Sequence, residues 1–269
     1  QERFRSEQIT NDADLQALKN DLQSVCEPRG NWHPTGLEQG TCYHALGHLL
    51  MYATGADINK SIQICREVSI KPSGHDWSKL CFDGTFMQIF QPLENEDKVL
   101  VTGKQPRKEE LASFCSKYSG QERVACWGEG WPLYLEDLLK PSGLVNYCSR
   151  SILTSQSDQD QCYSGLFYVM TAEFQFDLNK VRNYCTGLPE QRMGQCFANA
   201  ASRLIETDYR NISKVITFCG SALSLASKDT CYQELLKYST YNFHAGSDEF
   251  FLLCNSLPEP YKDKCLVGF

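Results

Sequence analysis

The chain has 269 residues, enough for one large domain or two small ones, and 42% of them are hydrophobic, as is ordinary for a folded protein. The formal net charge is −7 and no tract is rich in Lys or Arg, which excludes nucleic acid as an expected partner, because phosphates require clustered positive charge. No apolar run approaches the ~18 residues of a spanning helix, so we expect no transmembrane segment in this chain.

Cysteine is the residue type that dominates the sequence: there are fourteen, and no two are closer than eleven positions. Zinc, iron–sulfur and thioredoxin-like sites usually need two cysteines separated by only two to four positions. An even number of widely spread cysteines instead indicates disulfides and an extracytoplasmic location, whether secreted, at the cell surface, or in a periplasm or lumen. A first residue that is not Met fits removal of a signal peptide. The cysteines are Cys26, Cys42, Cys65, Cys81, Cys115, Cys126, Cys148, Cys162, Cys185, Cys196, Cys219, Cys231, Cys254 and Cys265.

The N-terminal segment, residues 1–25, is polar apart from a weak amphipathic pattern at Leu15, Leu18 and Leu22. Such a segment is typical of a helix that caps the end of a repeat array. We therefore predict a capping segment over 1–25 and a single disulfide-linked helical domain over 26–269.

From Cys42 onward the cysteines define a repeat. Short gaps of 11 to 16 positions alternate with long gaps of 22 to 34, and an aromatic residue directly follows the second cysteine of each short gap from Cys42 to Cys231. A period near 35 residues predicts an all-α, disulfide-stapled solenoid of about six to seven αα-hairpins. A first helix follows each such cysteine, and a second helix opens at a capping residue such as Asp57, Asp177 or Asn211.

Two disulfide patterns are compatible with this arrangement. A cysteine of one helix can pair with the end of its own partner helix, as Cys42 with Cys65, or the pairing can cross the next loop, as Cys26 with Cys42. The first pattern leaves Cys26 and Cys265 unpaired, whereas the second uses all fourteen cysteines, and we expect the second.

The segment 162–185, CYSGLFYVMTAEFQFDLNKVRNYC, resembles the cysteine-rich Sel1-like repeats, which are relatives of the tetratricopeptide repeats. The resemblance extends over most of residues 26–265. It implies a right-handed superhelix of αα-hairpins with one disulfide per unit, used mainly to bind proteins or peptides.

Residues 91–110 interrupt the period by about eleven positions and contain two prolines and alternating charges. A long exposed loop explains this insertion, and a binding loop is the alternative.

Histidines gather near the start of the repeats. His44 and His48 are four apart at the expected start of a helix, so both project from one face, which is how a helix presents two imidazoles to one metal ion or haem. His33 and His75 lie in the two longest loops between paired cysteines, and Asp83 is the counterpart of His44 one repeat later. We expect these five residues to be candidate metal ligands, and copper, zinc and haem iron all accept imidazole.

Two functions follow from these patterns. The first is a scaffold that binds another protein, as a subunit of a surface or periplasmic assembly; the second is a metal- or haem-binding protein that uses the histidine cluster. An enzyme has the least support, since no nucleophile-elbow motif is present. Glu129 lies between two glycines and two tryptophans, and we interpret Trp127 and Trp131 as core residues, with an aromatic binding box as the alternative.

Overall fold

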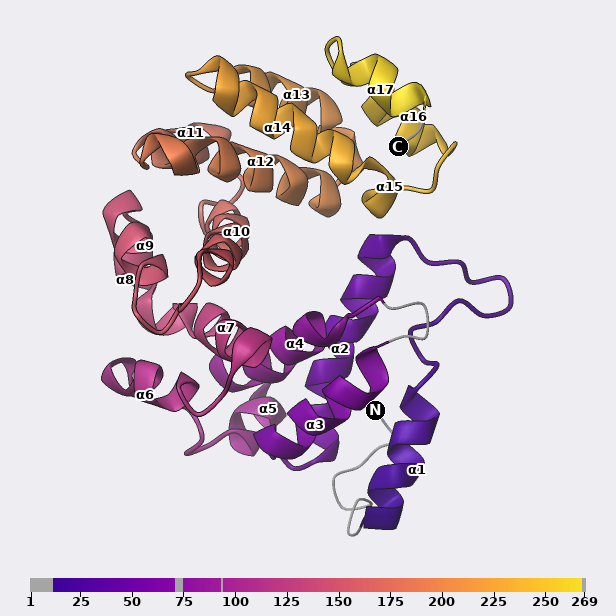
Figure 1. Cartoon of the computed structure of the whole chain (residues 1–269), viewed down its shortest axis with the longest axis vertical. Coiled ribbons are helices and arrows are strands. Elements are labelled where there is room, and N and C mark those ends of the chain that lie inside the picture. Colours follow the sequence, from indigo (N-terminus) through magenta and orange to yellow (C-terminus); the bar gives the residue numbers. More distant parts are fainter. Residues whose placement is uncertain (1–11, 71–74, 93, 268–269) are drawn as a thin grey trace. The chain divides into compact units, whose positions relative to one another are not determined.

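The computed structural model describes residues 12–70, 75–92 and 94–267, and these residues are predominantly helical (Figure 1). Their β-type pairings are isolated bridges, Arg29 with Trp32 and Ile70 with Asp76. The all-α prediction is therefore confirmed for the described part of the chain. Within the same ranges, no helix combines the length and the apolar character needed to cross a membrane.

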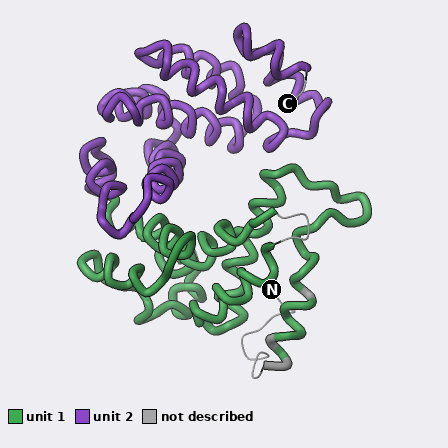
Figure 2. The backbone as a smooth tube through the Cα atoms, in the orientation of Figure 1, with its two compact units in different colours: residues 1–135 green, residues 136–269 purple. Residues whose placement is uncertain are grey.

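The chain forms two compact units, residues 1–135 and 136–269, where the repeat pattern predicted one continuous domain over 26–269 (Figure 2). Within the predicted capping segment, residues 1–11 lie outside the described residues, and the remainder contains helix α1 (Asp12–Leu22). Leu18 and Leu22 are buried. Lys19 forms an ion pair of 2.6 Å with Glu67, which lies in helix α3 (Ile58–Ser69).

The remaining elements of unit 1 are α2 (Gly36–Ala53), α3 (Ile58–Ser69), α4 (Ser78–Phe90), α5 (Asn95–Leu100), η2 (Lys108–Glu110), α6 (Leu111–Cys115), α7 (Gly120–Glu129) and η3 (Trp131–Tyr134). Helix α8 (Leu135–Leu138) begins at the last residue of unit 1. Unit 2 continues with α9 (Pro141–Cys148), α10 (Gln156–Glu173), α11 (Leu178–Thr186), α12 (Glu190–Thr207), η4 (Tyr209–Asn211), α13 (Ile212–Gly220), α14 (Leu225–Lys237), α15 (Ser239–Asn242), α16 (Asp248–Ser256) and α17 (Tyr261–Val267).

Helix α2 begins well before its cysteine. Thr35 and Glu38 form a capping box, in which the Thr35 hydroxyl accepts from the Glu38 amide and the Glu38 carboxylate accepts from the Thr35 amide. The prediction that the helix starts at Cys42 is therefore wrong, and His44 and His48 lie in its middle. This matters because mid-helix side chains face the neighbouring helix rather than a loop.

The predicted caps of the second helices are partly confirmed. Asp57 and Asp177 accept first-turn amides of α3 and α11 through their carboxylates. Asn211 is wrong as a capping side chain: it ends the 3-10 turn η4, and its side-chain amide donates to the carbonyl of Leu204 instead.

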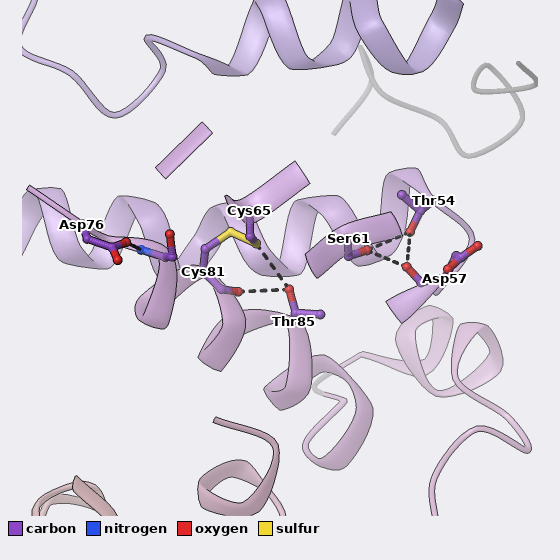
Figure 3. Close-up of a disulfide and its surroundings, with 8 residues drawn as sticks. Thr54, Asp57, Ser61, Cys65, Asp76, Cys81 and Thr85 are labelled. Atoms are coloured by element: carbon purple, nitrogen blue, oxygen red, sulfur yellow. Dashed lines mark hydrogen bonds between the residues drawn. A yellow bond between two sulfur atoms is a disulfide. The ribbon is translucent and has the colours of Figure 1, made fainter. Parts of the chain in front are cut away.

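The disulfides follow the second pattern throughout, because each cysteine bonds to its neighbour across the next connection. For example, Cys65 of α3 bonds to Cys81 of α4, and the Thr85 hydroxyl donates to the Cys81 carbonyl beside them at 3.0 Å (Figure 3). Seven disulfides indicate an oxidising environment. The pairs are Cys26–Cys42, Cys65–Cys81, Cys115–Cys126, Cys148–Cys162, Cys185–Cys196, Cys219–Cys231 and Cys254–Cys265.

Two glycines bring α2 and α4 into backbone contact. A Cβ atom on Gly47 would lie 2.1 Å from the carbonyl oxygen of Cys81, and one on Gly84 would lie 1.9 Å from the carbonyl oxygen of His44. Only residues without a side chain fit this crossing. The close approach places the middle of α2 directly against the middle of α4.

The insertion at 91–110 is not simply an exposed loop. It contains α5 and η2, and its Val101 and Pro106 are buried. The Lys104 ammonium donates to the carbonyls of Gly55 and Ala56, at 2.9 and 2.7 Å, in the turn that joins α2 to α3. The insertion is therefore fastened to the α2–α3 hairpin.

Candidate functional site

The α2–α4 crossing brings two imidazoles together. His44 and His48 lie one turn apart on α2, and their Nε2 atoms are 3.3 Å apart. The rings are tilted by 56° with centroids 5.2 Å apart, so the two nitrogens meet at their tips rather than by stacking. This separation suits two ligands of one metal ion: with bonds of about 2.0 Å, the two nitrogens subtend an angle of about 110° at the ion.

Helix α4 supplies the neighbours of these imidazoles. The Met87 thioether sulfur lies 3.3 Å from His44 Nε2, and the Gln88 carbonyl oxygen lies 2.6 Å from His48 Nδ1. Because a carbonyl oxygen only accepts, the Gln88 contact places the His48 proton on Nδ1 and leaves the Nε2 lone pair directed at His44. Two nitrogens and one sulfur therefore meet around His44, and all three are electron-pair donors when His44 carries its proton on Nδ1.

The electrostatics of the site keep His44 uncharged. Burial lowers the pKa of the His44 imidazole, and the neighbouring His48 lowers this pKa further, while Asp83 acts in the opposite direction. A neutral imidazole is the form that binds metals. His44, His48 and Met87 all keep partial solvent exposure, so the donors remain reachable from outside.

Asp83, predicted as a ligand or as a partner of a ligand, contacts a lysine. Both of its carboxylate oxygens accept from the Lys79 ammonium, at 3.0 and 2.7 Å. Asp83 lies one turn before Met87 on α4 and influences His44 through its charge. The ion pair occupies the carboxylate, so Asp83 does not complete the donor set of the histidines.

His33 and His75 do not join the pair either. His33 is exposed in the connection before α2, and His75 is exposed and packs against the Trp77 ring, with centroids 4.2 Å apart. Throughout the described ranges, no three His, Cys, Asp or Glu side chains are grouped so as to hold a metal ion. The expected convergence of four histidines is therefore not found, and any third donor must be of another residue type.

A carboxyl group from a third helix belongs to the same polar region. Glu129 ends α7, and its carboxylate accepts from the Gln91 amide at 2.9 Å. Although Glu129 keeps some solvent exposure, burial raises its pKa to about 8, and Asp83 adds to the increase, whereas Lys79 and the Gln91 hydrogen bond oppose it. Glu129 is thus held largely neutral near pH 7, and the interpretation of its neighbours Trp127 and Trp131 as core residues is confirmed because both are buried.

Sequence reasoning missed Met87, Gln88 and Glu129. One signal was available: Lys79, Asp83 and Met87 recur every four residues and so share one face of α4. Placing that face against His44 and His48 required the true start of α2, which the capping pair of Thr35 and Glu38 marks.

No family model, curated protein or solved structure matches this chain. The geometry of His44, His48 and Met87 is therefore what indicates a function.

Proposed function

We propose that this protein binds a transition-metal ion through His44 and His48, on an extracytoplasmic frame of disulfide-linked αα repeats. The observation that carries the proposal is the 3.3 Å separation of the two Nε2 atoms. Two imidazole nitrogens at this distance can share one hydrogen bond or bind one cation, and we favour the cation because the Met87 sulfur lies at the same distance from His44 Nε2 and adds a third donor.

A metal ion fits this site better than haem. A haem bound by both histidines would have to enter between two nitrogens that are 3.3 Å apart, where α2 and α4 already touch through Gly47 and Gly84. An ion needs only the small space at the meeting point of the donors. The disulfide-linked helices then serve to hold the two turns of α2 that carry His44 and His48 in a fixed geometry.

Metal content tests the proposal. Protein purified without a histidine tag from an oxidising compartment is challenged with copper or zinc, dialysed and analysed by mass spectrometry. Wild type should retain near-stoichiometric metal, and His44→Ala/His48→Ala should retain almost none. His33→Ala/His75→Ala is the matched control, because these two exposed histidines lie in the same unit, and it should bind as wild type does. Equal loss in both variants, or no retention by wild type, would overturn the proposal.

Binding of another protein is the second candidate, and exposed leucines in unit 2 favour it. Leu223 and Leu225, at the connection from α13 to α14, are 70% and 83% exposed. Large apolar side chains exposed together are typical of interaction surfaces. Peptides selected by display on wild type should lose affinity for Leu223→Ser/Leu225→Ser and keep it for Val99→Ser, a control at an equally exposed position in unit 1. Retained affinity in the leucine variant would remove this surface from consideration.

A further inference from the structure

The donors around His44 define which metal the site favours, an inference that rests on the proposed function. Met87 approaches from α4, and its sulfur lies 3.3 Å from His44 Nε2, the same distance that separates the two imidazole nitrogens. For a metal–nitrogen bond of about 2.0 Å and a metal–sulfur bond of about 2.3 Å, this distance corresponds to an angle of about 100° at the ion. The His44–His48 and His44–Met87 distances thus both suit pairs of ligands bound to one metal ion.

The chemistry of the third donor discriminates among metals. A thioether is neutral, polarisable and soft; it binds Cu(I) and is a poor ligand for Zn²⁺, Mg²⁺ or Ca²⁺. Hard ions prefer oxygen ligands, and Zn²⁺ prefers nitrogen, thiolate or carboxylate donors to a thioether. Among the described residues no third Asp, Glu, His or Cys joins the two histidines, and Asp83 is engaged by Lys79.

The surroundings fix the orientation of the donors. Gln88 accepts from His48 Nδ1 and is itself buried, so it holds the ring with Nε2 toward His44. The crossing at Gly47 and Gly84 sets the distance between the α2 and α4 donors. An ordered set of two nitrogens and one sulfur suits the low coordination number of Cu(I).

We propose that His44, His48 and Met87 form a three-ligand site for copper in the +1 state, with Gln88 as the residue that positions His48. The site binds Cu(I) without reducing or oxidising it. All fourteen cysteines are in disulfides, so no thiolate competes for the ion.

Anaerobic competition with a chromophoric Cu(I) chelator tests this assignment, with ascorbate as reductant because it spares the disulfides. Met87→Leu keeps the size and apolar character of the side chain and removes the sulfur. We expect it to weaken Cu(I) binding by about 10- to 100-fold, the scale typical of site perturbations, and to change Zn²⁺ binding by less than about threefold. Met193→Leu, in α12 of unit 2, is the matched control and should match wild type.

The outcomes separate this inference from the proposed function. Unchanged Cu(I) affinity in Met87→Leu, together with metal loss in His44→Ala/His48→Ala, would overturn the Cu(I) assignment and leave the metal-binding proposal standing. If both Met87→Leu and His44→Ala/His48→Ala bind metal as wild type does, the Cu(I) assignment and the metal-binding proposal are both overturned. X-ray absorption of the copper-loaded wild type guards against misfolding of a variant: a sulfur scatterer at about 2.3 Å supports the assignment, and a purely nitrogen and oxygen shell contradicts it.

Discussion

Units 1 and 2 place polar side chains at equivalent positions but satisfy them differently. In unit 2, the counterparts of His44 and His48 are Ser164 and Tyr168 of α10. The Ser164 hydroxyl accepts from the Gln195 amide at 2.9 Å, and Tyr168 lies under the Arg203 guanidinium, with 3.9 Å from its central carbon to the ring centroid. Ser164 and Tyr168 therefore each have a complementary partner, a hydrogen-bond donor for the hydroxyl and a cation for the ring.

In unit 1, by contrast, His44 Nε2 lies 3.3 Å from both His48 Nε2 and the Met87 sulfur, and a proton on His44 Nε2 is the hydrogen that could join it to either of them. One proton joins His44 to only one of these two neighbours well, whereas a cation can bind all three donors. The two units show that equivalent positions of one helical repeat can hold polar groups with complementary partners, as in unit 2, or groups that can act together as ligands, as in unit 1. Three predictions test how far the difference between the two units extends.

The largest effect is expected at the crossing of α2 and α4, where Gly47 meets Gly84. Gly84→Ala would place a Cβ atom 1.9 Å from the His44 carbonyl oxygen, which forces α2 and α4 apart and should cost about 2 kcal/mol or more of unfolding free energy. Chemical denaturation measures the loss, and metal retention should fall with it.

Gly165→Ala in α10 of unit 2 is the control for this variant. No atom lies within 4 Å of its added Cβ, so alanine there should stabilise the helix by about 0.5–1 kcal/mol. Equal behaviour of the two glycine variants would show that the crossing at Gly84 tolerates a side chain.

A smaller effect should appear in the pH dependence of stability. Burial raises the pKa of Glu129 to about 8, above its ordinary value of 4.5, so between these values the folded state holds a proton that the unfolded state has released. The unfolding free energy contributed by this group therefore falls as pH rises from about 4.5 to about 8. Glu129→Gln should flatten that decline and make the variant more stable than wild type at pH 8.

Glu206 in unit 2 provides the comparison. Burial also raises its pKa, but its hydrogen bond with Tyr168 and the nearby Arg203 lower it again. Glu206→Gln should therefore shift the pH profile in the same direction by less. A larger shift from Glu206→Gln than from Glu129→Gln would reverse our ranking of the two units.

The smallest effect is expected when the three donors are transplanted into unit 2, because the transplanted site should bind no copper. Ser164→His/Tyr168→His/Ser202→Met installs the three donors of unit 1 at the equivalent positions of α10 and α12. The positions that correspond to Gly47 and Gly84 are Phe167 and Asn199, so the two helices lack the glycine contact. We expect no retained Cu(I) in a His44→Ala/His48→Ala background, and stoichiometric copper there would mean that the crossing is dispensable.

The helical class and the disulfide pairs could be predicted because both depend on local or countable features. An aromatic follows each alternate cysteine from Cys42 to Cys231, at the helical repeat, and of the two pairing patterns only one uses all fourteen cysteines. The pair of His44 and His48 could also be predicted, since spacing along one helix fixes it.

The remainder of the site depends on how α2 crosses α4. Which turn of α4 faces His44 follows from the contact of Gly47 with Gly84, a long-range match that spacing alone does not reveal. His33 and His75 were misassigned because proximity in sequence to a helix entrance does not bring a loop side chain to the middle of that helix.

The connectivity of the disulfides has a consequence for biosynthesis. Every cysteine bonds to the next unpaired one along the chain, and the closed loops span 11 to 16 positions without overlapping. Oxidation in order of emergence into an oxidising compartment therefore gives the native set directly, and no later exchange by an isomerase is required. Since no disulfide joins residues 1–135 to 136–269, one proteolytic cut at that boundary would leave two fragments with no covalent link, even without a reductant.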